Sequence, residues 1–330
     1  MSNPLLDELD IHTVEISLPT GGLFYEDDVL GTADPERIKI SPIGIIAEQA
    51  YRDPLLLASG RGLPMMLHHV CPDIIKPEEL AEVDIDLILL TTRMLSYGND
   101  MILDHVCEEC EETNQIKVDI QKFILKYDPV TLGLADIDSD FGIPPDYIFP
   151  VEETGQTVIL RPMSYFDTSR AIVKSFEIQQ QYDDMNGSED KAIDMSQLLS
   201  KSMMDQYNDI VDISTESGVD SLVANIHFIR TKSGQDVFNM DDIREWILHL
   251  NTKIIERMQE QIRELSDKLR KISDVKYKCI HCEHDNEMFL QLDPQRLFNS
   301  AAASSTQTVP SDSLKTTAKK KKKPPKTSQR

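Results

Sequence analysis

The sequence contains little positive charge for its size. Its 330 residues include 34 Lys and Arg against 57 Asp and Glu, which gives a net charge of −23 at pH 7. A surface of this sign repels nucleic acids and anionic membranes, so nonspecific binding of either by the body of the protein is not expected. The length exceeds that of one typical module, and we therefore expect two domains or more.

Long apolar runs are also missing. No stretch of 18 apolar residues occurs, so no transmembrane helix is expected. The N-terminus is acidic and lacks the basic and apolar regions of a secretory signal. We therefore expect a protein of the reducing cytoplasm, where cysteines serve more often as metal ligands or free thiols than as disulfides.

Signatures of common enzyme classes are absent as well. The sequence has no Walker loop, no complete GxGxxG, no HExxH and no GxSxG. Asp136, Asp138 and Asp140 have the spacing of a calcium loop, but Phe141 stands where Gly is required and Tyr147 where Glu is required. We therefore predict a non-enzymatic protein.

Hydrophobic periodicity predicts an α+β fold with a mostly helical body and short strands. The expected strands are 14–19, 36–42, 101–107 and 157–162, and the expected helices are 44–58, 78–96, 164–182, 192–215 and 241–272. The last of these, which includes Trp246, would be one helix of about 48 Å. Its apolar stripe is either part of the core or a face that binds a partner.

Composition divides the chain into four parts. Residues 1–125 form an N-terminal half, and 126–156 form an acidic linker that contains proline. Residues 157–299 form a C-terminal half with the long helix, and 300–330 form a flexible tail rich in lysine. Polar segments with few apolar side chains cannot offset their ordering entropy by burial, which is why the tail is expected to lie outside the folded body.

The two halves repeat a short pattern. Each contains a CxxC pair, followed four residues later by Asn114 in the first half and Asn286 in the second, and then by an alternating strand that ends at Asp. Upstream, each half has a strand that ends in proline, at Pro42 and Pro162. The pattern indicates a duplication whose second copy carries an insertion, because the distance from proline to CxxC is 65 residues in one half and 117 in the other.

The cysteine pairs carry the clearest chemistry in the sequence. A CxxC turn presents two thiolates on one side of a tight loop, and four thiolates complete a tetrahedral zinc shell. We predict one structural zinc shared by two CxxC β-hairpins, a zinc-ribbon-like clasp held by Cys107, Cys110, Cys279 and Cys282. The 168 intervening residues exceed the usual ribbon spacing of roughly 15–20. Two metal-free turns, a redox pair, or ligation by His281 or His284 remain alternatives.

The tail has the opposite charge to the body. Eight basic residues and one acidic residue give residues 300–330 a charge of +7, so residues 1–299 carry −30. The tail is either solvated or docks on an acidic surface, which the body of the protein itself offers. Its candidate electrostatic residues are Lys319, Lys320, Lys321, Lys322 and Lys323.

Several short segments, in this order, resemble the T4-type bacteriophage baseplate proteins, the family of the baseplate hub assembly protein. They are Leu18-Pro19-Thr20-Gly21-Gly22-Leu23-Phe24-Tyr25, Ser41-Pro42, Arg93-Met94-Leu95-Ser96-Tyr97-Gly98 before the first CxxC, and Leu290-Gln291-Leu292-Asp293-Pro294 with Phe298 after the second. The resemblance implies a non-enzymatic component of a contractile tail, a virion protein assembled in the host cytoplasm.

The resemblance also implies the partners. They are other baseplate and tail proteins, with a homo-oligomer as a further option and no membrane. The residues expected at such contacts are Leu18, Pro19, Gly22, Phe24, Tyr25 and Trp246. A buried N-terminal hairpin is the alternative for the first five. The competing function is a viral zinc-ribbon regulator that binds nucleic acid through its basic tail, which the −30 body disfavours.

Overall fold

The structure is a computed structural model that describes residues 12–186, 215–270, 274–290, 292 and 294–299. Within these residues it is a mixture of helices and small antiparallel sheets, which confirms the predicted α+β class. No helix in this part of the chain is long and apolar enough to cross a lipid bilayer.

The first half runs from a small sheet through a group of helices to a long hairpin. Its elements are β1 (Val14–Ile16), α2 (Asp27–Leu30), β2 (Ile38–Ile40), α3 (Ile45–Arg52), α4 (Pro54–Ala58), α5 (Gly62–Val70), α6 (Glu82–Tyr97), β3 (Asp100–Val106), β4 (Thr113–Asp119), α7 (Ile120–Ile124) and α8 (Pro129–Leu132). Strand β1 pairs with β2 and β3 pairs with β4, both antiparallel.

The second half repeats this order with a larger sheet. Its elements are β5 (Ile148–Val151), β6 (Gln156–Leu160), α9 (Tyr165–Asn186), β7 (Ile226–Arg230), β8 (Asp236–Val237), α12 (Met240–Leu248), α13 (Thr252–Arg270), β9 (Asp274–Lys278), β10 (Asp285–Phe289) and α14 (Pro294–Asn299). Strands β5 to β8 form one antiparallel sheet in sequence order, and β9 pairs with β10. In both halves a short helix, α7 or α14, follows the hairpin.

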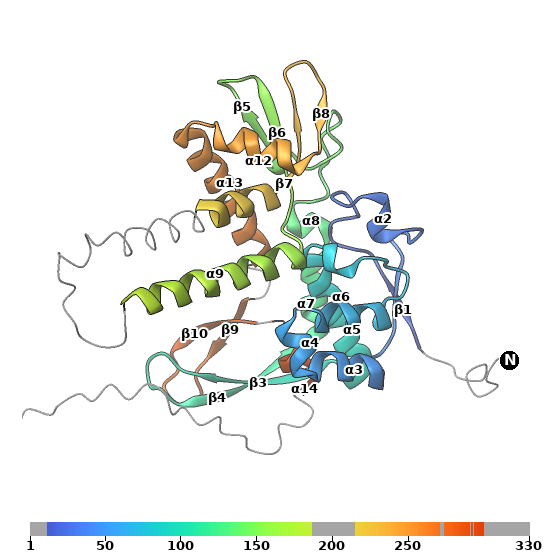
Figure 1. The fold of residues 1–330 in the computed structure, drawn as a ribbon. Helices are drawn as coiled ribbons and strands as arrows, with labels where there is room; N and C mark the ends of the chain where they lie inside the picture. The colour runs from blue at the N-terminus through green and yellow to red at the C-terminus, as the bar shows by residue number, and fades with distance from the viewer. Residues whose placement is uncertain (1–11, 187–214, 271–273, 291, 293, 300–330) are drawn as a thin grey trace, which may run out of the picture.

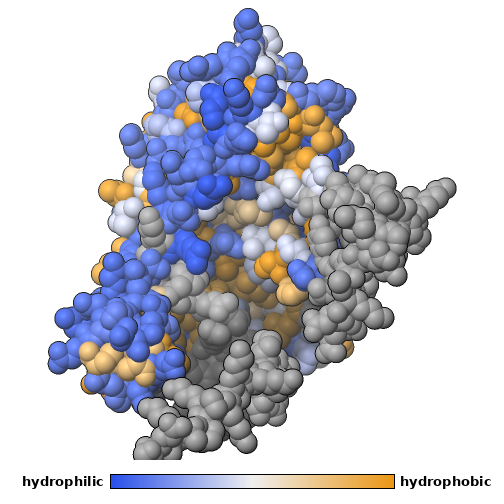
Figure 2. All heavy atoms as spheres, turned by 90° about the vertical axis from the view of Figure 1, so that its left-hand side faces the viewer, coloured by the Kyte–Doolittle hydropathy of each residue, from blue (hydrophilic) through white to orange (hydrophobic). Residues whose placement is uncertain are grey.

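The elements form two lobes, with α9 between them (Figure 1). The upper lobe contains the sheet β5–β8 with α12 and α13, and the lower lobe contains α3 to α7 with α14. The hairpins β3–β4 and β9–β10 lie side by side below α9. Figure 2 shows that the molecule is hollowed between the lobes and that apolar side chains line the hollow.

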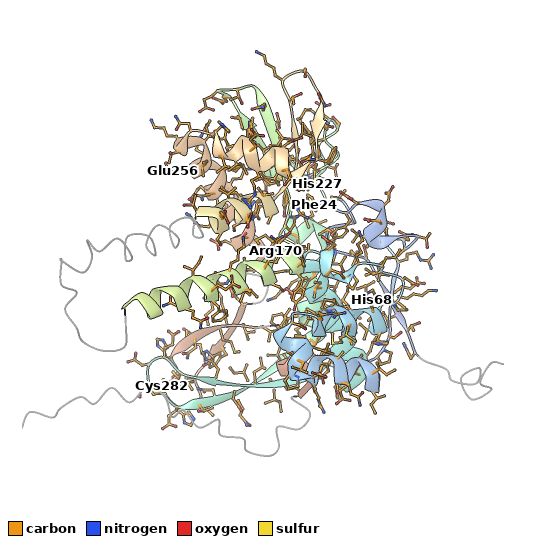
Figure 3. The ribbon with its side chains drawn as sticks, viewed as in Figure 1. Phe24, His68, Arg170, His227, Glu256 and Cys282 are labelled. Atoms are coloured by element: carbon orange, nitrogen blue, oxygen red, sulfur yellow. The ribbon has the colours of Figure 1, made fainter. Side chains whose placement is uncertain are left out.

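A single hydrophobic core connects the lobes. The ring of Phe24 packs on Tyr147 at 5.0 Å between centroids and meets His227 edge-on at 6.2 Å. Figure 3 shows Phe24 and His227 next to each other where the lobes join. Burial, with the nearby Arg161, lowers the pKa of His227 to about 4, so this imidazole is neutral at physiological pH.

The predicted single helix over 241–272 is wrong. Two helices, α12 and α13, occupy this region and are separated at residues 249–251. The side chain of Asn251 accepts a hydrogen bond from the N–H of Lys253, which begins a new helix instead of continuing the old one. Ile247 and Ile254 are nevertheless both buried, because the apolar spacing continues across the break.

The predicted helix over 44–58 is interrupted in a similar way. Asp53 caps α4 by accepting hydrogen bonds from the N–H groups of Leu55 and Leu56 at 2.8 and 3.3 Å, and Pro54 cannot continue α3. The helix expected over 192–215 lies outside the described residues, apart from residue 215. The expected linker 126–156 contributes strand β5 and buries Tyr127 and Tyr147, so this segment packs into the core.

The Leu18-to-Tyr25 segment is fixed by a buried carboxylate on α6. Asp84 accepts hydrogen bonds from the backbone N–H and the hydroxyl of Thr20, at 3.0 and 2.5 Å, and from the hydroxyl of Tyr25. The Tyr25 hydroxyl in turn accepts the N–H of Ala81 at 2.9 Å. Burial raises the pKa of Asp84 to about 6, while the bonds from Thr20 and Tyr25 oppose this rise. One carboxylate thus adds three hydrogen bonds to a segment whose Leu18 and Phe24 side chains are also buried in the core.

We expect Asp84→Ala to lower the free energy of unfolding by about 3 kcal/mol, because it leaves two buried hydroxyls and a buried N–H without an acceptor. Urea denaturation followed by circular dichroism measures the change. Glu26→Ala, at an exposed position of the same segment, is the control and should change stability by less than about 0.5 kcal/mol. Equal stability of the two variants would contradict the assignment.

Candidate metal centre

Four cysteines from the two halves meet at the tips of the hairpins. Each CxxC lies in the turn of its hairpin, between β3 and β4 or between β9 and β10. The Sγ atoms of Cys107 and Cys282 are 3.7 Å apart, and those of Cys110 and Cys279 are 3.6 Å apart. All four sulfur atoms lie within 4.8 Å of one another. Figure 3 shows Cys282 at the end of the paired hairpins.

The two turns have the same local structure. In the first, the N–H of Cys107 donates to Glu112 O and the N–H of Glu111 donates to Cys107 O. In the second, the N–H of Cys279 donates to His284 O and the N–H of Glu283 donates to Cys279 O. Glu111 and Glu283 both adopt the left-handed backbone conformation, with φ of 59° and 61°. Glu111 and Glu283 thus occupy equivalent positions and turn the backbone of the two hairpins in the same way, as the repeat predicts.

Two buried asparagines link each turn to the other. The side-chain amide of Asn114 donates to Cys279 Sγ at 3.5 Å, and its Oδ1 accepts the N–H of Ile280 at 2.9 Å. Asn286 makes the reciprocal contacts, donating to Cys107 Sγ at 3.4 Å and accepting the N–H of Glu108 at 3.1 Å. Each asparagine therefore binds the first cysteine, and the residue after it, in the opposite hairpin.

A further cross-hairpin contact lies nearer the body. His105 Nδ1 and the Tyr277 hydroxyl are 2.7 Å apart, and their rings meet edge-on at 5.6 Å. It joins β3 to β9, so the two hairpins associate along their strands as well as at their tips.

Hydrogen bonds at the tips favour the thiolate form of two cysteines. Burial opposes ionisation of Cys279, but the N–H groups of His281 and Cys282 and the amide of Asn114 hold its pKa at about 6. The backbone N–H of Cys110, with help from Asn286, lowers the pKa of Cys107. N–H donors aimed at sulfur stabilise negative charge there.

This donor set fits a structural metal. Four thiolates at about 2.3 Å from a Zn²⁺ ion lie about 3.8 Å from each other, close to the two shortest sulfur–sulfur separations here. A four-thiolate shell leaves no coordination position for water or substrate. The geometry is therefore that of a site that holds two segments together, with the asparagines as its outer hydrogen-bonding shell.

The other cysteine and the nearby histidines do not join this cluster. Cys71 is fully buried, its thiol donates to Leu67 O, and burial raises its pKa to about 12. His281 and His284 are exposed and belong to no metal-binding group within the described residues.

The residues predicted for partner contact have mixed positions. Leu18, Pro19 and Phe24 are buried within the chain, while Gly22 and Tyr25 are half-buried. The buried-hairpin alternative therefore describes the first three. Trp246 is half-buried on α12, and its indole N–H donates to Gln156 Oε1 at 3.0 Å. Lys319, Lys320, Lys321, Lys322 and Lys323 lie outside the described residues.

Two groups of polar residues were not singled out from the sequence. Asp84 gives no signal, because a carboxylate inside an apolar helix pattern reads as a solvent-facing position. The asparagines did give a signal, their equal spacing from each CxxC, but that spacing predicts only the repeat. Their reciprocal bonds become visible only when the hairpins are paired in space.

The fold is α+β, and four cysteines, two from each half of the chain, lie together where a metal ion could be held. A family model described as "T4 bacteriophage base plate protein" matches residues 52–299, most of the chain and both cysteine pairs. The chain therefore belongs to the T4 baseplate protein family, which confirms the resemblance seen in the sequence. Neither the curated proteins nor the solved structures contain a match to it.

We expect Asn114→Ala and Asn286→Ala to destabilise the protein equally, each by about 2 kcal/mol, because each removes an N–H···S bond and leaves a backbone N–H unpaired. Chemical denaturation of the two single variants measures this. Gln115→Ala, at the neighbouring exposed position of β4, is the matched control. Clearly unequal costs for the two asparagines would contradict the reciprocal arrangement.

Proposed function

We propose that this protein is a non-enzymatic structural or assembly component of a contractile phage tail, located in the baseplate near the hub. The family match over residues 52–299 carries the proposal, since it spans both hairpins and most of both lobes. The protein would be assembled in the host cytoplasm and bind neighbouring baseplate subunits. The family match gives no support to the alternative, a zinc-ribbon regulator that binds nucleic acid through its basic tail. We therefore retain only the baseplate function.

The proposal includes a structural zinc bound by Cys107, Cys110, Cys279 and Cys282. The sulfur–sulfur distances and the hydrogen bonds to Cys107 and Cys279 support it. Metal binding in such a site contributes directly to folding free energy, because the unfolded chain has no preformed site. A metal that joins residues of both halves would hold their relative position while neighbouring subunits pull on either.

Partner contacts are proposed for the remaining accessible residues of the predicted set. Gly22, Tyr25 and Trp246 are only half-buried, so their exposed edges are available to another subunit, whereas Leu18, Pro19 and Phe24 would support that surface from below. The proposal also includes the domain boundaries at residues 125, 156 and 299. It further includes association of copies of this chain into a homo-oligomer. An acidic body requires basic patches on its neighbours.

We expect native mass spectrometry to find one zinc per chain. Cys279→Ser should abolish binding and lower the Tm by about 10 °C or more, because a three-thiolate site is weakened and the hairpins lose their common centre. Cys71→Ser is the matched control, a buried cysteine away from the cluster that should leave the zinc content unchanged. Full zinc occupancy in Cys279→Ser would refute the four-cysteine site.

We expect the protein to be found with tail components during phage assembly. Quantitative mass spectrometry of purified virions and of isolated baseplate intermediates provides the measurement. Presence in the intermediates, in a fixed ratio to other baseplate proteins, is the expected result. Absence from both, with recovery in a nucleic-acid complex, would overturn the proposal.

A further inference from the structure

A cavity of about 430 Å³ lies between the helices of the lower lobe and the first half of α9. Its walls are largely apolar and come from four regions of the chain: Leu57 and Leu63, Ile85 and Leu89 of α6, Ile172 of α9, and Leu290, Leu292 and Pro294 before α14. Ile172 is also 52% exposed, so the apolar lining continues onto the surface.

Two carboxylates one helical turn apart also line this cavity, Glu82 and Asp86 of α6. No Lys, Arg or His is among its lining residues, and neither carboxylate forms an ion pair within the described part of the chain. The Tyr127 hydroxyl donates to Asp86 at 3.3 Å. Burial, reinforced by Glu82, raises the pKa of Asp86 to about 7. Burial raises the pKa of Glu82 too, although a hydrogen bond with Thr168 opposes this rise. The cavity therefore combines apolar walls with two carboxyl groups whose ionised forms a bound cation would stabilise.

A buried hydroxyl also lies in the same cavity. Tyr51 lines the cavity and is fully buried, and its hydroxyl makes no hydrogen bond of good geometry within the described residues, although the Arg52 guanidinium lies close enough to oppose the rise that burial causes in the Tyr51 pKa. A buried polar group without a partner is costly, and a ligand that donates or accepts a hydrogen bond here would remove that cost. The cavity thus suits an occupant with an apolar part and a cationic, hydrogen-bonding end.

The C-terminal tail leaves the folded body beside this cavity. Pro294, at the start of α14, is part of its wall, and the ring of Phe298 packs on Tyr51 at 5.4 Å between centroids. Residue 300 follows directly. The 16 residues from Ser300 to Lys315 span at most about 55 Å when extended, so the tether does not limit access to the cavity. It also gives the tail a high effective concentration there.

We propose that the Lys-rich tail of this chain docks in its own acidic cavity, with the segment from Leu314 to Lys323 as the occupant. Leu314 supplies an apolar side chain next to Lys315, and the run from Lys319 supplies further cations. The +7 tail and the −30 body attract each other at any separation below the screening length. The docked tail would cover an apolar surface and neutralise Glu82 and Asp86 until a neighbouring subunit displaces it.

Trypsin cleavage of the Lys run in the full-length protein tests this contact. At low salt, Glu82→Gln/Asp86→Asn should accelerate cleavage about tenfold, because the docked tail resists the protease and the neutral cavity releases it. Glu256→Gln/Glu264→Gln, at two exposed positions of α13 that do not line the cavity, is the matched control and should cleave at the wild-type rate. Equal rates in all three proteins would overturn the proposal.

Carbodiimide cross-linking of the unaltered protein gives a test that requires no variant to fold. The expected products join tail lysines to Glu82 or Asp86 within one chain, and 1 M salt should suppress them. Mixing isotopically labelled and unlabelled protein separates links within a chain from links between copies. Links scattered over all surface carboxylates, or links only between copies, would overturn the intrachain contact.

Discussion

The reciprocal packing of the two CxxC hairpins is the constraint on which the relation between the halves depends. A two-stranded hairpin buries too little apolar surface to be stable alone in water. Here no side chain of β9 is fully buried, and alternate residues of β3 and β4 are exposed. Each hairpin therefore requires the other, and the connection is polar: two amide side chains, two N–H···S bonds and four thiols. Because Asn114 and Asn286 exchange equivalent bonds, separation of the hairpins would break both sets at once, which makes the contact cooperative.

A second polar contact helps to join the halves where the two lobes meet. Asp84 attaches the segment from Thr20 to Tyr25 to α6, and Phe24 in that segment then reaches Tyr147 and His227 of the second half. The two halves are thus joined at the hairpins by hydrogen bonds to sulfur and at the core by an aromatic contact that a buried carboxylate positions. Two separate attachments restrict the relative movement of the halves, since one contact alone would act as a hinge.

The sequence predicted those features that local chemistry determines. The spacing of Cys107 and Cys110, repeated at Cys279 and Cys282, predicted two equivalent turns, and each is indeed a hairpin turn with the same hydrogen bonds. Periodicity located most helices but missed the break at Asn251, because Ile247, Leu250 and Ile254 keep the spacing of one continuous helix. It also presented residues 126–156 as a linker, because Tyr127 and Tyr147 are isolated in an acidic stretch and only the fold shows what they pack against. The role of Asp84 depends on a contact 64 residues away, which no local pattern encodes.

Charge is distributed unevenly along this chain, because residues 1–299 carry −30 and residues 300–330 carry +7. The described body makes many exposed ion pairs, such as Arg37 with Glu15 and Lys268 with Asp146, and pairs of this kind contribute little stability. They do not remove the excess of carboxylates, and within the described residues Glu82 and Asp86 form no ion pair beside the apolar wall of the cavity. If the tail docks as we propose, it would supply the missing positive charge and cover this surface before assembly. A neighbouring subunit that binds more tightly would then displace it, so that these carboxylates would contribute to the choice of partner.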